Sequence, residues 1–258
     1  MKKIALIAVS ALILTSSAYA YVPPSEFIVK TIASKRHGVR SIRVRSVLTA
    51  VQNGQPQGQK LKETVWIDYT NHLIRSRMDD ESGRELYAIE RRLDANIPLV
   101  DLLLLDSQPE VLAKGLRQNG IPIRSEAELL SMKSEEERRL SETESIARIT
   151  GGIAWVIGNM TDGSQLWVEK DTFLPVKLVV KSDDKNYEMI FDGFRYAKEV
   201  PYPKVMNVAG IRIESTDMGV NVDMSEMKST LRPGFTEAGE SLDSATSELI
   251  RHFYQLVR

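Results

Sequence analysis

Short segments that alternate apolar with polar residues, separated by tight turns, constrain the fold of this chain more than any other feature. The segment at residues 42–50 is the clearest, because one of its faces is largely apolar and the other carries two arginines. Similar segments follow at 64–69 and 85–92, and five more lie between residues 153 and 216. Period-two alternation is typical of β-strands, and connections this short join antiparallel neighbours. The sequence therefore predicts a large antiparallel sheet.

Four other segments have the features of helices. One is expected to begin near Ser25 and to end before Gly38, and another opens at Pro109. Residues 97–105 are so densely apolar that their helix is expected to be buried on most sides. Residues 249–257 have the apolar spacing of an amphipathic helix.

Together these elements predict a fold of the α+β class, a curled antiparallel sheet that forms a half-open β-barrel of about ten strands closed by inserted helices. Curling the sheet around the apolar helix buries both apolar surfaces and leaves a gap between helix and wall. If that gap is apolar, it is a binding site for an apolar ligand. Because no repeat or long linker divides the chain, residues 21–258 are expected to form a single domain.

Two charged segments each allow two interpretations. Residues 125–148, an expected insertion in the domain, are either a solvated helix or partly ordered excursion, or an element that binds a partner. A second segment is basic, and it contains Lys35, Arg36, His37, Arg40, Arg43 and Arg45. It is either an exposed helix end and strand face that protects a sheet edge, or a cationic rim that attracts lipid head groups or an anionic membrane surface.

Residues 1–20 have the organisation of an export signal. Lys2 and Lys3 form a positive start, residues 4–14 are apolar, and Ala18-Tyr19-Ala20 supplies the small residues of a cleavage site. The apolar run is shorter than the roughly 20 residues that a membrane-spanning helix needs. The sequence therefore predicts a bacterial protein that is soluble in the periplasm after cleavage.

The mature chain of 238 residues would contain no cysteine and would carry 32 basic against 35 acidic residues. Its stability must come from its core, without disulfides, and it offers no thiol for lipid attachment. The nearly neutral charge argues against a globally basic nucleic-acid-binding protein.

The side chains of common catalytic and metal sites are missing or lack the required spacing. None of the three histidines, His37, His72 and His252, has a second ligand at metal-binding spacing, and the acidic clusters lack the pattern of a calcium loop. We find no nucleophile elbow, acylation motif or phosphate-binding glycine loop. The sequence thus predicts no metal, no cofactor and no catalytic residue. A hydrolase with two carboxylates on separate strands is the alternative.

Residues 166–203 carry a pattern that resembles a known family. The chain reads LWVEKDTFLPVKL at 166–178, YEMIF at 187–191, GFRY at 193–196 and PYP at 201–203. This resembles the LolA-like lipoprotein-carrier superfamily, in which a Trp-bearing strand, an acidic turn and a Leu-Pro precede a returning strand with an aromatic end and a proline. The chain is longer than simple carriers, and its missing cysteine excludes a lipidated acceptor.

The resemblance implies a non-catalytic carrier that holds acyl chains of lipoproteins or other lipids in a hydrophobic cavity and moves them toward the outer membrane. A transient inner- or outer-membrane protein would be a partner, and Arg40, Arg43 and Arg45 would face head groups or the membrane. Relatives that sense envelope damage share the fold, so a sensor or regulatory binding module is the alternative. The residues expected to line the cavity, each of which could instead belong to the core, are Val44, Leu48, Trp66, Leu99, Leu102, Leu103, Trp167, Leu178, Met189 and Phe191.

Overall fold

The computed structural model describes residues 22–94, 96–132, 144–161, 163–182, 185–228, 234–235 and 244–258. The predicted export signal, residues 1–20, and the densest part of the charged stretch, residues 135–139, lie outside these ranges. The described residues contain one twelve-stranded sheet and six helices.

All twelve strands form one sheet of antiparallel neighbours in the order β12-β4-β3-β2-β1-β11-β10-β9-β8-β7-β6-β5. Two local meanders, β1 to β4 and β5 to β11, meet where β1 pairs with β11. The strands are β1 (Ser41–Gln52), β2 (Gln55–Asp68), β3 (Leu73–Asp79), β4 (Glu85–Arg92), β5 (Glu144–Ile149), β6 (Gly152–Gly158), β7 (Gln165–Glu169), β8 (Pro175–Ser182), β9 (Lys185–Ala197), β10 (Val200–Val208), β11 (Ile211–Val220) and β12 (Gly234–Phe235).

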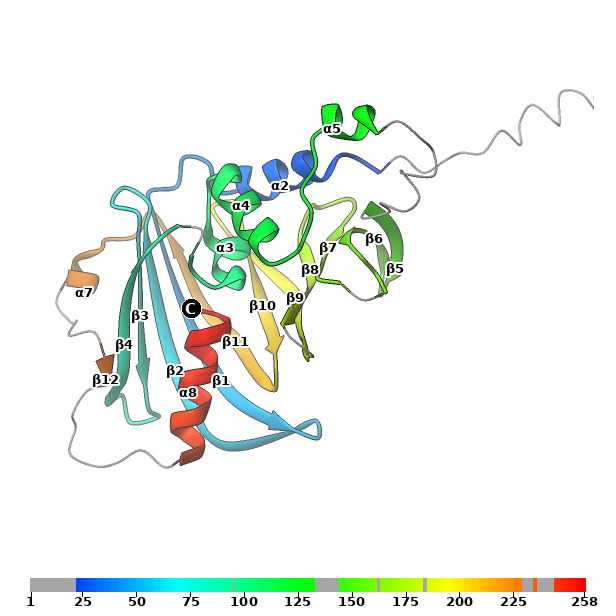
Figure 1. Cartoon of the computed structure of the whole chain (residues 1–258). Helices are drawn as coiled ribbons and strands as arrows, with labels where there is room; N and C mark the ends of the chain where they lie inside the picture. The colour runs from blue at the N-terminus through cyan, green and yellow to red at the C-terminus, as the bar shows by residue number, and fades with distance from the viewer. Residues whose placement is uncertain are drawn as a thin grey trace, which may run out of the picture.

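The sheet curls around two helices, as Figure 1 shows. Helices α3 (Leu99–Leu105) and α8 (Ser244–Leu256) lie on its concave side, and α2 (Ser25–Ser34) and α4 (Pro109–Gln118) lie together at one end. The outermost strands β12 and β5 do not pair with each other, so the sheet remains open. The predicted α+β class and curled antiparallel sheet are confirmed, with twelve strands in the described residues rather than about ten.

Alternation along β1 determines which of its side chains face the helices. Ile42, Val44, Ser46 and Leu48 are buried on the concave face, whereas Arg45 is exposed on the convex face. The concave face continues across neighbouring strands because opposite residues share a face. One apolar row there consists of Phe191, Met206, Ile213, Leu48 and Leu61. All seven residues of α3 are buried, as the dense apolar run predicts.

The charged stretch at 125–148 does not form one helix. A short helix, α5 (Glu126–Ser131), follows Ser125, whose side chain accepts a hydrogen bond from the Glu128 backbone in a capping box. Residues 144–149 form strand β5, which pairs with β6 at the sheet edge. The prediction of a helix or partly ordered excursion is therefore wrong for residues 144–148. The high charge of the stretch obscured the alternation of an edge strand, which pairs only with β6.

Two details of the elements differ from what local sequence preferences alone indicate. Phe27 precedes buried Ile28 in α2 yet has 52% of its surface exposed, and the helix begins after Pro24 without a side-chain hydrogen bond that caps it. Pro201 and Pro203 lie inside strand β10. They are tolerated because the pairing of β10 with β11 begins only at Val205, so these prolines face one neighbouring strand.

The elements that follow β11 lie on different sides of the sheet. After β11, the helix α7 (Ser225–Lys228) lies near the convex face, where the Met227 carbonyl accepts a hydrogen bond from Arg75. Strand β12 then extends the edge beside β4, and α8 lies inside the curl (Figure 1). The predicted amphipathic face of residues 249–257 is confirmed, and its buried residues pack on the chain's own sheet.

Replacing Phe253 with alanine tests whether α8 belongs to the core. Its ring is fully buried, so Phe253→Ala is expected to lower the free energy of unfolding by about 3–5 kcal/mol. The neighbouring His252 is exposed, and His252→Ala should change stability by less than about 0.5 kcal/mol. Urea unfolding followed by circular dichroism measures both values, and equal effects would contradict the placement of α8.

Candidate binding site in the concave face

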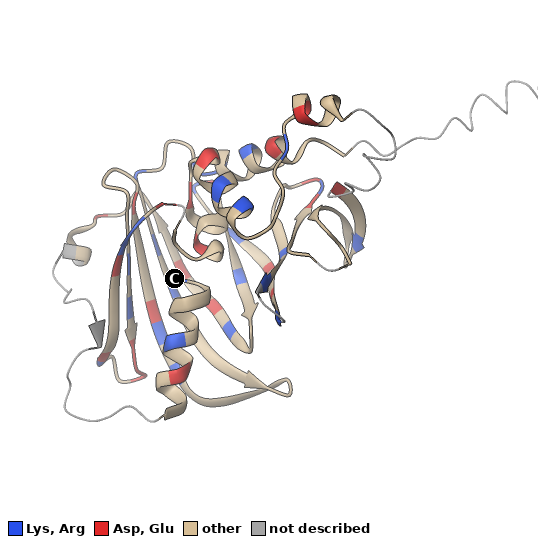
Figure 2. Cartoon of the chain, viewed as in Figure 1, with Lys and Arg blue, Asp and Glu red and all other residues tan. Residues whose placement is uncertain are grey.

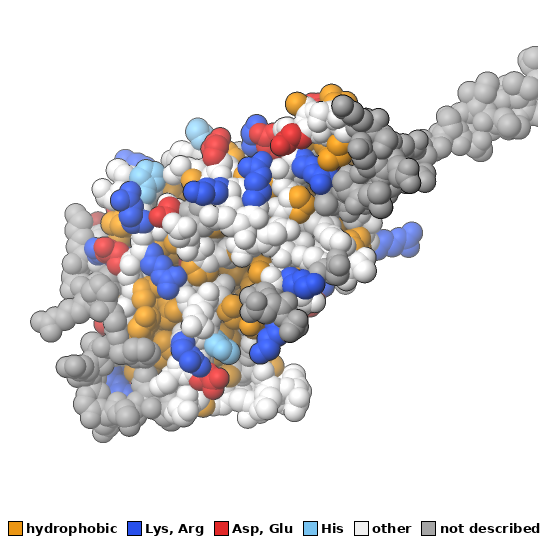
Figure 3. All heavy atoms as spheres, viewed as in Figure 1, with side chains coloured by type: hydrophobic (Ala, Val, Ile, Leu, Met, Phe, Trp, Pro, Cys, Tyr) orange, Lys and Arg blue, Asp and Glu red, His pale blue; other side chains and the backbone are white. Residues whose placement is uncertain are grey.

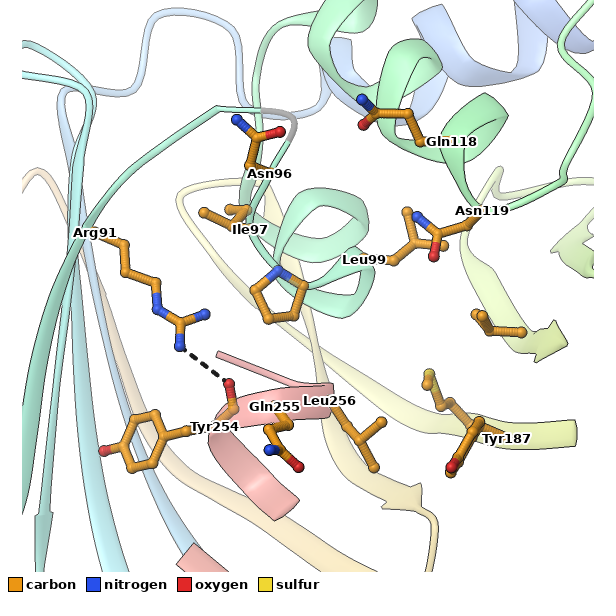
Figure 4. Close-up of a pocket in the computed structure, with 13 residues that line it drawn as sticks. Arg91, Asn96, Ile97, Leu99, Gln118, Asn119, Tyr187, Tyr254, Gln255 and Leu256 are labelled. Carbon is orange, nitrogen blue, oxygen red and sulfur yellow. Dashed lines mark hydrogen bonds between the residues drawn. The ribbon is translucent and has the colours of Figure 1, made fainter. Parts of the chain in front are cut away.

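A pocket of about 690 Å³ opens where the last turn of α8 approaches α3 and the β8–β9 hairpin. Figure 4 shows the end of α8 on one side, the segment before α3 on the other, and β9 across from β4. The lining residues are Arg91, Asn96, Ile97, Pro98, Leu99, Gln118, Asn119, Val180, Tyr187, Met189, Tyr254, Gln255 and Leu256. The lining thus consists of apolar side chains, neutral polar side chains and one charged residue, Arg91.

The sheet register explains which side chains reach this pocket. Met189 pairs with Leu178, and both belong to the concave face, whereas the next residue, Ile190, is 41% exposed on the convex face. In the space-filling view, hydrophobic side chains are visible on both sides of the end of α8, with Lys and Arg around them (Figure 3). The pocket therefore combines an apolar floor with a polar rim.

Two of the ten sequence-predicted cavity residues, Leu99 and Met189, line the pocket. Six others are packed in the hydrophobic core, namely Val44, Leu48, Leu102, Leu103, Leu178 and Phe191. Their side chains are almost fully buried. Their direct contact with a ligand stays a prediction.

The two tryptophans among the ten predicted residues, Trp66 and Trp167, lie on the convex face and do not contribute to the pocket. Trp66 pairs with Arg43, the neighbour of inward-facing Val44, and the Arg77 guanidinium lies 5.9 Å from its ring centroid. Trp167 pairs with Lys177, whose Nζ lies 5.3 Å from the indole centroid. Strand parity places both side chains opposite the helices.

The basic residues at 35–45 do not gather into one rim. Arg36 is 2% exposed and donates from Nη1 to the carbonyl oxygens of Ile32 and Asp106, both at 3.2 Å. Arg43 and Arg45 lie on the convex face, where Arg43 forms an ion pair with Asp217 at 3.0 Å. Figure 2 shows charges of both signs interspersed over strands and helices. Arg43 and Arg45 therefore lie on the face opposite the pocket, and the head-group role of Arg40, Arg43 and Arg45 stays a prediction.

A buried ionic cluster, formed by Arg258, Glu63 and Asp101, lies between α8, the sheet and α3. The Arg258 guanidinium donates from Nε to Glu63 Oε1 at 2.7 Å, and from Nη1 to Asp101. The side chains of all three residues are fully shielded from solvent. Nη2 also donates to the Tyr202 hydroxyl at 3.1 Å. The cluster joins the end of the chain to strand β2 and helix α3.

Polar contacts continue from this cluster along α8. The hydroxyl of Ser76 donates to Glu63 at 2.7 Å and lies 2.8 Å from the Tyr254 hydroxyl. Sequence reasoning missed this network, although Asp101 is the one charged residue in the otherwise apolar segment LVDLLLL. A carboxylate in a buried helix requires a hydrogen-bonding or charged partner, so Asp101 could have indicated a buried polar contact.

Two carboxylates share one guanidinium in this cluster, so full ionisation would bury a net negative charge. Burial raises the pKa of Asp101 to about 7, despite the opposing attraction of Arg258. Both carboxylates are paired and inaccessible, so they offer no open pair for hydrolysis. Within the described ranges, no group of three or more His, Cys, Asp or Glu could hold a metal ion, and no helix is long and apolar enough to cross a membrane.

Comparison with solved structures finds similar architecture at low sequence identity. A LolA superfamily protein from Nitrosomonas europaea is 14% identical, with a TM-score of 0.46 over 82% of this chain and 99% of that one. A domain from Vibrio parahaemolyticus, described as an outer membrane lipoprotein-sorting protein, is 9% identical, with a TM-score of 0.46 over 79% and 94%. A DUF1329 family protein from Desulfovibrio piger is 9% identical, with a TM-score of 0.41 over 79% and 96%.

No family model and no curated protein matches the chain. The similar structures include one member of the superfamily that residues 166–203 resemble. At these identities and TM-scores the likeness carries nothing about function.

The buried cluster predicts a pH-dependent stability that Asp101→Asn removes. Because the pKa of Asp101 rises from 3.8 to about 7 on folding, its contribution to stability is fully present below pH 4 and is lost as the pH rises through about 7. The free energy of unfolding of the natural chain should therefore fall, relative to that of Asp101→Asn, by about 1 kcal/mol or more between pH 5 and pH 8. Urea unfolding at several pH values measures the difference, and a constant difference would contradict the assignment.

Proposed function

We propose that this chain is a soluble periplasmic carrier that binds acyl chains of lipoproteins or other lipids and moves them toward the outer membrane. The observation that supports it most is the pocket at the end of α8, which opens on the concave face and presents Leu99, Met189 and Leu256. Residues 21–258 would act as one lipid-binding domain. No catalytic step is part of the proposal.

Burial of an acyl chain supplies the binding energy. Each methylene transferred from water gains about 0.8 kcal/mol, so about eight buried methylenes would gain about 6 kcal/mol before the cost of immobilising the chain. The volume of about 690 Å³ lies in the usual range of small-molecule sites, roughly 300 to 1,000 Å³. Larger cargo would require α8 to move. Cargo can favour such a moved state only if it binds that state more tightly than the state in this structure.

A sensor or regulatory binding module is the second candidate, and helix α5 favours it. None of its residues is buried, and Leu130 exposes 70% of its surface. A segment of this kind could contact a partner protein. Deleting residues 126–143 separates the two candidates, because a carrier should keep its lipid whereas a sensor should lose its partner.

Neighbouring residues of β9 provide a matched test of the carrier proposal. Met189 lines the pocket and Ile190 faces outward, so Met189→Gln buries an amide beside the ligand and Ile190→Gln does not. We expect Met189→Gln to weaken binding of a fluorescent long-chain acyl probe about tenfold, and Ile190→Gln to leave it within twofold. Fluorescence titration measures both affinities.

Protein purified from the periplasm provides the second measurement. Native mass spectrometry and solvent extraction should find an acyl-containing ligand, on a chain that begins at Tyr21. Absence of any such ligand, together with no uptake of the acyl probe, would refute the carrier proposal.

A further inference from the structure

We propose that the pocket selects single-chain lipids with a free anionic head group, which the guanidinium of Arg91 binds while the chain lies toward Met189. This inference rests on the proposed function and specifies its ligand class. Arg91 is the one charged residue among the thirteen that line the pocket. A single cation in an otherwise neutral, partly apolar pocket is complementary to an amphiphile with one negative charge.

The position of Arg91 in the sheet directs its side chain into the pocket. It pairs with Ile74, which is buried on the concave face, whereas Arg92 pairs with Leu73 and is exposed. In Figure 4, Arg91 extends from β4 toward the last turn of α8. The arginine is thus held beside the pocket by a strand of the main sheet.

The guanidinium of Arg91 has more N–H donors than its one hydrogen bond to Tyr254 uses. Its Nη2 donates to the Tyr254 carbonyl at 3.3 Å, which is one of the carbonyls left unpaired at the end of α8. Among the described residues, no carboxylate lies within ion-pair distance of Arg91, although Asp101, which is paired with Arg258, is near enough to attract its charge. A guanidinium carries five N–H donors and can bind a carboxylate or phosphate through two of them.

The opposite side of the pocket provides the surface for the chain. Figure 4 places Tyr187 across from Arg91, with Leu99 and Leu256 between the two sides. Val180 and Met189 complete this apolar part. A ligand that pairs its head with Arg91 would therefore extend its chain between α3 and α8 toward β9.

The test compares lipids that share one chain and differ in head charge. Dodecanoate and dodecyl phosphate are anionic, and methyl dodecanoate is neutral, so displacement of the uncharged fluorescent probe phenylnaphthylamine reports the preference. We expect both anions to bind the natural mature chain about tenfold more tightly than the ester, with the preference falling as salt is raised. Their ratio identifies which anionic head is favoured.

Adjacent arginines provide the control variants. Arg91→Gln should abolish the preference of the pocket for the anions over the ester, whereas Arg92→Gln, with the same charge change on the other face, should keep that preference. Arg91→Lys retains the positive charge and should therefore keep most of the preference for anions. It separates loss of the charge from any loosening of α8 in Arg91→Gln.

Two results would overturn the inference, and they are distinguishable from failure of the carrier proposal. Equal binding of ester and anions by the natural chain refutes the head-group selectivity alone, as does equal loss of preference in Arg91→Gln and Arg92→Gln. If neither the probe nor any of the three lipids binds, both proposals fail.

Discussion

The buried guanidinium of Arg258 is the contact on which the concave side of the molecule depends. It joins three parts of the chain that are distant in sequence, because Glu63 belongs to β2, Asp101 to α3 and Tyr202 to β10. Each charged group would be costly to bury alone, so their positions are mutually dependent. With the guanidinium in place, α8 can press its apolar residues against the sheet, and the pocket is the space that this arrangement leaves at its end.

This arrangement changes the expected picture of a sheet closed by one apolar helix. Two helices divide the concavity, and most of the apolar residues of the wall contact protein rather than an open space. The pocket lies where the last turn of α8 approaches α3 and the β8–β9 hairpin. The pocket is consequently small, lined on one side by Arg91 and Tyr254, and suited to one chain rather than to a large apolar assembly.

Much of the sheet could be predicted from the sequence, because alternation of the kind seen from Ile42 to Leu48 directly records which face is buried. The tryptophans show the limit of this reasoning. Trp66 is 2% exposed although it lies on the convex face, so its hydrophobicity and burial do not identify its face. The face follows only from the register with β1, in which Trp66 pairs with Arg43. The site itself depends on contacts between α8, α3 and β9, and no local pattern of residues encodes where those distant elements meet.

The pairing of β1 with β11 also has a consequence for how the chain reaches its native state. Each meander can assemble from contacts that are local in sequence, but their junction joins Ile42 to Val220. Such non-local pairing slows folding, because a long loop must close before any contact compensates its entropy. The rate-limiting event should therefore be the meeting of two preformed half-sheets, and α8 can enter the concavity only after that junction has created it.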